Sequence, residues 1–185
     1  MEDSLSALGE LREAKRIADV GAGAGFPGLV LAIALPRAHV DLVESQRRKT
    51  AVIDRLAQAA LTDNARSVNA RAEEWASVPA PIGGREGYEA VTARAVDRLA
   101  VLAEYASPLL QQGGVLVAWK GARDEDEEAQ AAAAAEGLGM SVEAVRRVQP
   151  FPDAEQRHLH VLRKTGPTPV GIPRRPGMAR KRPLG

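Results

Sequence analysis

The chain has 185 residues, 45% of them hydrophobic, and it contains no cysteine. This length predicts one domain with a single core, and the lack of cysteine excludes disulfide frameworks, cysteine-type zinc sites and cysteine nucleophiles. An apolar run of the roughly 20 residues that a membrane-spanning helix needs is absent, and the N-terminus does not resemble a signal peptide. We expect a soluble, cytoplasmic, monomeric protein that binds no membrane.

Charge is distributed unevenly along the chain. The net charge of the whole chain is +1. The final segment, residues 166–185, has five basic residues and no acidic one, whereas the rest of the chain has 20 basic and 24 acidic residues. Five prolines in the final segment predict that it runs extended or partly disordered and forms no core of its own. A basic tail on a mildly acidic body suggests contact with a polyanion, although it could serve solubility alone. We therefore divide the chain into a folded domain, residues 1–165, and a basic, proline-rich tail.

Strands and helices alternate along the body. Strands are predicted over residues 17–20, 39–43, 67–70, 88–93 and 115–119. Helices are predicted over residues 26–35, 46–60, 98–110 and 124–136. Two hairpin strands follow, over residues 141–151 and 157–164. This order predicts an α/β fold with a Rossmann-like, seven-stranded, mostly parallel sheet and an antiparallel terminal hairpin.

A glycine-rich turn, DVGAGAGFPG, lies between the first predicted strand and the first helix. In an open parallel sheet, ligands bind at the carboxyl ends of the strands, and glycines let the backbone approach them closely. Glu44 ends the second strand, 23 residues after Gly21. Its carboxylate can accept hydrogen bonds from both hydroxyls of a ribose and would repel a 2′-phosphate, which disfavours NADP.

Two cofactors fit these anchors, NAD and S-adenosylmethionine. The dinucleotide fingerprint G-x-G-x-x-G directs a helix N-terminus at a pyrophosphate, whereas this turn reads G-A-G-A-G-F-P-G. That spacing is closer to the methyltransferase form, and Phe26-Pro27 would crowd a pyrophosphate. The chain has no room for a separate substrate domain and no obvious His or Tyr for hydride transfer, so an NAD-dependent oxidoreductase is the weaker alternative.

Six segments of the chain resemble one family when they are taken in order. They are DVGAGAGFPGLVLAIALP, VDLVESQRRKTAVIDRL, ARAEEW, VTARAV, GGVLVAWKG and RHLHVLRKT. Together they resemble the small-subunit ribosomal RNA methyltransferase G family, also called glucose-inhibited division protein B, over about residues 3–182. The resemblance implies a class I S-adenosylmethionine-dependent methyltransferase that methylates N7 of one guanine in 16S rRNA, with the 30S ribosomal subunit as its partner. Family members usually carry a helical segment before the first strand, and this chain is expected to begin inside the end of it, either because its start is assigned late or because it is truncated.

The resemblance also implies a cofactor site along one rim of the sheet. Its residues would be Gly21, Gly23, Phe26, Glu44, Ala72, Glu73 and Arg94. Glu44 would hold the ribose, Glu73 would meet the adenine edge, and Arg94 would sit beside the cofactor and face the substrate. Two alternatives stay open, because Arg94 could be a surface ion-pair partner and Glu73 could simply begin a short helix.

Guanine N7 has a lone pair and no proton, so no catalytic base is expected, and Asp19 is expected to order the glycine turn or to bind the methionine amine. Basic residues would contact RNA phosphates. The candidates are Lys120, Arg123, Arg157, Arg174, Arg175, Lys181 and Arg182. Aromatic residues are only 3% of the chain, which favours recognition of RNA shape over base stacking. His158 and His160 lack further ligands, so no metal site is expected.

Two other functions remain open from the sequence. A methyltransferase of the same fold could act on another RNA, a protein or a small molecule, and the basic tail argues against the last two. A non-catalytic protein could bind the cofactor or RNA without turnover, and the intact set of Gly21, Glu44 and Arg94 argues against that.

Overall fold

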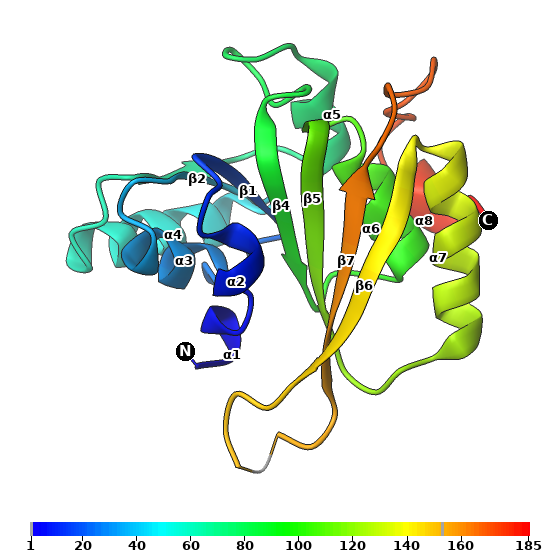
Figure 1. Ribbon diagram of the computed structural model, residues 1–185. Coiled ribbons are helices and arrows are strands. Elements are labelled where there is room, and N and C mark those ends of the chain that lie inside the picture. Colours follow the sequence, from blue (N-terminus) through cyan, green and yellow to red (C-terminus); the bar gives the residue numbers. More distant parts are fainter. Residues whose placement is uncertain (1, 153) are drawn as a thin grey trace.

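The computed structural model describes residues 2–152 and 154–185, and its centre is a seven-stranded sheet with helices on both faces (Figure 1). The strands are β1 (Arg16–Val20), β2 (His39–Val43), β3 (Ala65–Val68), β4 (Tyr88–Arg94), β5 (Leu110–Lys120), β6 (Met140–Val148) and β7 (Arg157–Lys164). The helices are α1 (Glu2–Leu5), α2 (Leu8–Leu11), α3 (Gly28–Ala34), α4 (Arg47–Ala59), α5 (Ala72–Ser77), α6 (Leu99–Ala106), α7 (Glu125–Gly137) and α8 (Met178–Lys181). None of the helices in these two ranges is both long and apolar enough to cross a bilayer.

The strand order is β3-β2-β1-β4-β5-β7-β6. Strands β1 to β5 pair in parallel, β7 is antiparallel to β5, and β6 is antiparallel to β7. This confirms the α/β class and the antiparallel terminal hairpin. The chain leaves β1 toward one edge of the sheet and returns at β4 toward the other edge. The glycine turn after β1 therefore lies where the strand order reverses, which is the usual ligand position in such sheets.

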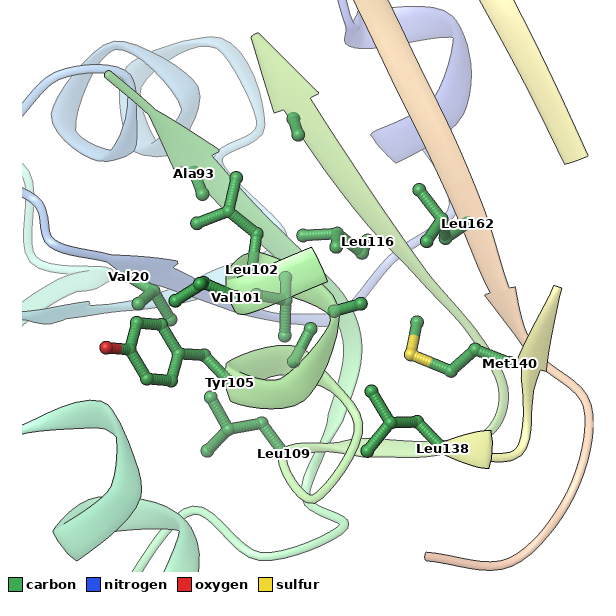
Figure 2. Close-up of a cluster of buried hydrophobic side chains, with 14 of the residues drawn as sticks. Val20, Ala93, Val101, Leu102, Tyr105, Leu109, Leu116, Leu138, Met140 and Leu162 are labelled. Atoms are coloured by element: carbon green, nitrogen blue, oxygen red, sulfur yellow. The ribbon is translucent and has the colours of Figure 1, made fainter. Parts of the chain in front are cut away.

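The core consists of two clusters, one on each face of the sheet. One cluster packs α5, α6, α7 and α8 against the sheet, and the other packs α2, α3 and α4 against the opposite face. Figure 2 shows the first, in which Leu102 of α6 lies near Ala93, and Leu116 lies near Leu162, its partner on the neighbouring strand. Neighbouring residues of one strand face different clusters, as Ile17 and Ala18 do. Because helices cover both faces, the central strands are largely apolar, with Asp19, Asp41 and Thr92 as buried polar exceptions.

Several boundaries differ from those predicted. Helix α6 ends at Ala106. Ser107 still has helical backbone angles, but Pro108 has no amide hydrogen with which to continue the helix. The prediction of helix up to residue 110 is therefore wrong. Strand β5 begins at Leu110 instead of Val115, and its register to β4 shifts between these two residues. Strand β3 lies two residues earlier than predicted, and α8 was not predicted as a helix.

The basic C-terminal segment, residues 166–185, packs against the body of the protein. It follows an irregular path along α6 and ends in the single turn α8, where Ala179 is 1% exposed and belongs to the core cluster of α6. Figure 1 shows α8 beside α6 and α7. The segment forms no core of its own, and its apolar and charged side chains find partners on the folded domain.

Candidate functional site

The glycine turn is held against β2 by backbone hydrogen bonds. The amides of Gly21 and Ala22 both donate to the Val43 carbonyl, at 2.9 and 3.2 Å. Gly21 has a φ of +67°, and a Cβ at this position would lie 2.8 Å from Cγ2 of Val96. A side chain at residue 21 would therefore strain the backbone and clash with the loop after β4.

Asp19 lies fully buried beneath this turn. Its Oδ2 accepts a hydrogen bond from the Gly28 amide at 2.9 Å, and its Oδ1 accepts one from the Thr92 hydroxyl at 2.8 Å. Burial raises the pKa of Asp19 to about 7, and the hydrogen bonds from Thr92 and Gly28 act in the opposite direction. These contacts tie the start of α3 to β1 and β4, which confirms that Asp19 orders the glycine turn.

Glu44, at the end of β2, presents a fixed carboxylate to the same turn. Its Oε2 accepts from the Gly23 amide at 3.1 Å, and its Oε1 accepts from the Gln46 amide at 2.8 Å. The residue is 6% exposed, so the carboxylate is largely removed from bulk water. Each carboxylate oxygen can accept more than one hydrogen bond. Glu44 can therefore still accept hydrogen bonds from the two hydroxyls of a ribose.

A cavity of about 240 Å³ opens beside Glu44 at the carboxyl ends of the strands. Of the predicted cofactor residues, Gly21, Glu44, Ala72 and Glu73 line it. The sequence did not indicate three further lining residues, which are Val96, Tyr105 and Arg180. No local pattern marked them, because they come from the loop after β4, from α6 and from the C-terminal segment.

Glu73 fits both interpretations that the sequence left open. It lies in the first turn of the short helix α5, and it also lines the cavity. Its Oε1 accepts a hydrogen bond from the Gly177 amide at 2.8 Å. The C-terminal segment thus reaches the wall of the cavity.

Phe26 and Arg94 are brought together, but neither is among the residues that line the cavity. The Arg94 guanidinium carbon lies 5.8 Å from the centre of the Phe26 ring. Arg94 also forms an ion pair with Asp3, with 3.2 Å between Nη1 and Oδ2. The two residues form a polar and aromatic patch where β4 ends and the glycine turn begins.

Two of the candidate RNA-contacting residues follow β5 and have acidic partners. Nζ of Lys120 lies 2.6 Å from Oε1 of Glu127, and Nε of Arg123 lies 2.9 Å from Oε1 of Glu128. The pKa of Glu128 falls to about 2, chiefly because Arg123 donates to it. Both basic side chains therefore lie close to carboxylates of α7.

The candidates in the C-terminal segment differ in their surroundings. Nε of Arg174 donates to Oε1 of Glu104 at 2.7 Å, and Glu104 is 2% exposed. Arg175 and Lys181 are exposed to solvent. Within the described residues, no group of three or more His, Cys, Asp and Glu side chains is placed to hold a metal ion.

The site suits a nucleoside cofactor with free ribose hydroxyls. Two of its lining residues, Glu44 and Glu73, are largely buried carboxylates that accept hydrogen bonds from backbone amides. A carboxylate at the ribose position would repel a phosphate. This donor and acceptor set fits S-adenosylmethionine, which has no phosphate.

Solved structures of similar fold are methyltransferases. A predicted O-methyltransferase from Agrobacterium tumefaciens superposes with a TM-score of 0.65 and 24% identity, covering 89% of this chain and 81% of that one. The antibiotic-resistance methyltransferase Kmr superposes with a TM-score of 0.62 and 18% identity, covering 89% of this chain and 93% of that one. This similarity supports the class I methyltransferase fold.

Sequence comparison identifies the family. The protein named ribosomal RNA small subunit methyltransferase G from Desulfitobacterium hafniense is 38% identical to this chain, and the match covers 98% of this chain and 74% of that protein. The protein of the same name from Pelotomaculum thermopropionicum is 41% identical, and the match covers 98% of this chain and 76% of that protein. The protein of that name from Roseiflexus castenholzii is 43% identical over 91% of this chain and 70% of its own. The model of the GidB family, described as rRNA small subunit methyltransferase G, matches residues 1–160. The chain belongs to the rRNA small subunit methyltransferase G family.

Proposed function

We propose that this protein transfers a methyl group from S-adenosylmethionine to N7 of one guanine in 16S ribosomal RNA. The observation that carries the proposal is the Glu44 carboxylate, held by the Gly23 and Gln46 amides beside the cavity at the glycine turn. Membership of the rRNA small subunit methyltransferase G family supports the choice of reaction and substrate. The protein acts as a cytoplasmic monomer on the small ribosomal subunit and needs no metal ion.

The cofactor is held at three points of the rim. Gly21 lets the backbone approach the methionine part, Glu44 accepts hydrogen bonds from the ribose hydroxyls, and Ala72 and Glu73 meet the adenine edge. These roles agree with the lining of the cavity. Asp19 does not face the cofactor but keeps the turn in shape, since its oxygens are engaged by Gly28 and Thr92.

The chemistry requires little of the protein beyond orientation. When bound, S-adenosylmethionine supplies a methyl group on a positively charged sulfur, which makes that methyl electrophilic. Guanine N7 offers a lone pair and has no proton to lose, so no side chain has to accept one. Positioning of two reactants can by itself account for about 7–11 kcal/mol of barrier reduction. The residues around the cavity therefore act by binding, orienting and excluding water.

Arg94 and Phe26 supply the substrate side of this arrangement. Arg94 is the last residue of β4 and precedes Ala95 and Val96, which line the cofactor cavity. A guanidinium and an aromatic ring at this place can contact an unstacked base or its phosphate. Contacts to phosphates farther away come from Lys120, Arg123, Arg175 and Lys181, whereas Arg174 serves to anchor the C-terminal segment.

The proposal is tested with S-adenosylmethionine carrying a labelled methyl group and 30S subunits from cells that lack the modification. We expect label in the RNA and none in the ribosomal proteins. Glu44→Gln should abolish most of the transfer, because a neutral amide replaces a charged acceptor. Glu13→Gln, the same change at an exposed glutamate outside this cavity, should leave it unchanged. Label in protein alone, or cofactor binding without transfer to either, would contradict the proposal and favour one of the other functions.

A further inference from the structure

The C-terminal segment contributes directly to the wall of the cofactor cavity. Arg180, in α8, is one of the residues that line it. The family model ends at residue 160, so this part of the wall lies beyond the residues that the model matches. Figure 1 shows α8 on the same side of the sheet as α6.

Gly177 fixes one oxygen of Glu73. Its amide donates to Oε1 of Glu73 at 2.8 Å, just before α8 begins. In the described part of the chain the second oxygen, Oε2, accepts no hydrogen bond, so it remains an acceptor. Glu73 is 6% exposed and lines the cavity, and its orientation therefore depends on the C-terminal segment.

Arg180 is fixed by the loop that follows β4. Its Nε donates to Oδ2 of Asp97, and its Nη2 donates to the Val96 carbonyl at 3.1 Å. Val96 also lines the cavity and packs over Gly21. The charge of Arg180 is balanced by Asp97, so the guanidinium adds no net positive field beside a cationic cofactor.

Tyr105 completes this end of the cavity. Burial, and to a lesser extent the neighbouring Glu73 carboxylate, raise the pKa of Tyr105 to about 12, while Arg180 acts in the opposite direction. The phenol is therefore protonated at neutral pH. In Figure 2 its ring lies beside Val20 and its hydroxyl points away from the hydrophobic cluster. A carboxylate, a phenol and a guanidinium thus lie close together in the lining of the cavity, which also includes Ala72.

The segment is anchored firmly enough to shape a binding site. Arg174 pairs with the buried Glu104 of α6, and Ala179 is packed into the core. Nη1 of Arg85 also donates to the Ile172 carbonyl at 3.0 Å. These contacts fix residues on both sides of Gly177.

We propose that residues 171–182 form the adenine-side wall of the cofactor site, with Arg180 in contact with the base and Gly177 orienting Glu73 to accept from the adenine amino group. The inference rests on the proposed function, because it takes the cavity to hold S-adenosylmethionine. With the ribose at Glu44, the base lies toward Ala72 and Glu73. The pKa of the Arg180 guanidinium is raised chiefly by its hydrogen bond to Asp97, and Glu73 lies close enough for its carboxylate to raise it as well. A planar guanidinium is suited to this position because it packs well on flat rings.

The test is calorimetric binding of S-adenosylhomocysteine and of adenosine to wild type, Arg180→Ala and the control Arg12→Ala, which removes an exposed arginine outside the cavity. We expect Arg180→Ala to weaken the binding of both ligands about tenfold, which corresponds to about 1.4 kcal/mol. Arg12→Ala should bind both as wild type does. In the methylation assay, Arg180→Ala should raise the KM for the cofactor about tenfold and leave kcat unchanged.

The outcomes separate this inference from the proposed function. A wild-type protein that binds neither ligand would contradict the proposed function and the inference with it. Wild-type binding that Arg180→Ala leaves intact would overturn only the role of the C-terminal segment. If Arg180→Ala does not fold, Arg180→Lys keeps a cation beside Asp97 but removes the planar group. We expect it to bind adenosine about tenfold more weakly, and unchanged affinity would overturn the inference.

Discussion

The Asp3 carboxylate lies 3.2 Å from the Arg94 guanidinium and thereby ties the first helix to the end of β4. The contact is supported by Trp119, whose indole nitrogen donates to the Asp3 carbonyl at 2.8 Å. On its other side, Arg94 lies over the Phe26 ring. The residue that we assign to the substrate side is therefore held between the N-terminal helix and the glycine turn.

Arg94→Ala should reduce the rate of methyl transfer to RNA at least tenfold, which corresponds to a loss of about 1.4 kcal/mol of transition-state stabilisation. The same variant should change the affinity for S-adenosylhomocysteine less than threefold. The reason is that Arg94 lies beside the cavity and is not among its lining residues. Asp3→Asn keeps a hydrogen-bond acceptor and should show a smaller loss. Steady-state kinetics and calorimetry provide the two values. An equal loss of ligand binding and of transfer would place Arg94 on the cofactor instead.

Gly28→Ala should destabilise the protein by about 1–3 kcal/mol, because the site has no room for a methyl group. An added Cβ would lie 2.7 Å from Oδ2 of Asp19 and 2.8 Å from Cδ2 of Leu42. The matched control is Gly137→Ala at the end of α7, where a Cβ meets nothing within 4 Å. Urea unfolding of both variants measures the difference, and equal stability of the two would show that the turn can adjust.

Asp19 should make the stability of the protein depend on pH. Its pKa in the folded protein is raised from 3.8 to about 7, so the folded state retains a proton that the unfolded state loses in this interval. The contribution of Asp19 to stability is therefore greatest below pH 3.8 and falls as the pH rises toward about 7. Asp19→Asn should remove this decline, so that the variant gains relative to wild type as pH increases. Urea unfolding across the interval tests this, and parallel curves for the two proteins would contradict it.

Arg174→Ala should cost about 3–5 kcal/mol, because it leaves the buried Glu104 carboxylate without its partner. The double variant with Glu104→Gln should recover part of that loss, since no buried charge then remains unpaired. Arg175→Ala is the control, because that side chain is exposed. Thermal unfolding gives the ranking. A stability of Arg174→Ala equal to that of Arg175→Ala would mean that the C-terminal segment is not anchored at Glu104.

The parts of the fold that sequence predicted well are those in which local pattern and burial agree. The alternating residues of β2 and the apolar half of β5 are examples, as is the hairpin β6–β7. The first half of β5 was missed because Gln111, Gln112 and two glycines show no apolar alternation. Helices α1 and α2 have four residues each, which is too short for a periodic signal.

The residues of the candidate site also divide into those that a local sequence pattern indicates and those that it does not. Gly21 and Glu44 were found because a glycine turn and an acid at a strand end form a local pattern with a known geometric meaning. Arg180 was missed because nothing near it in sequence indicates that it meets Asp97, which lies 83 residues earlier. Contacts between residues that are distant in sequence cannot be read from composition or periodicity. The basic, proline-rich composition of the C-terminal segment suggested disorder, and the sequence did not show that its partners lie on other helices and loops.

The central claim, methylation of a single guanine at N7, is tested most directly by mapping the modified base. RNA from 30S subunits treated with the protein and S-adenosylmethionine is reduced with borohydride and cleaved with aniline, which breaks the chain at N7-methylguanine, and the break is located by primer extension. We expect one break in 16S rRNA that is absent when Glu44→Gln replaces the wild-type protein. Labelled RNA that does not break, or that breaks at many guanines, would contradict the account.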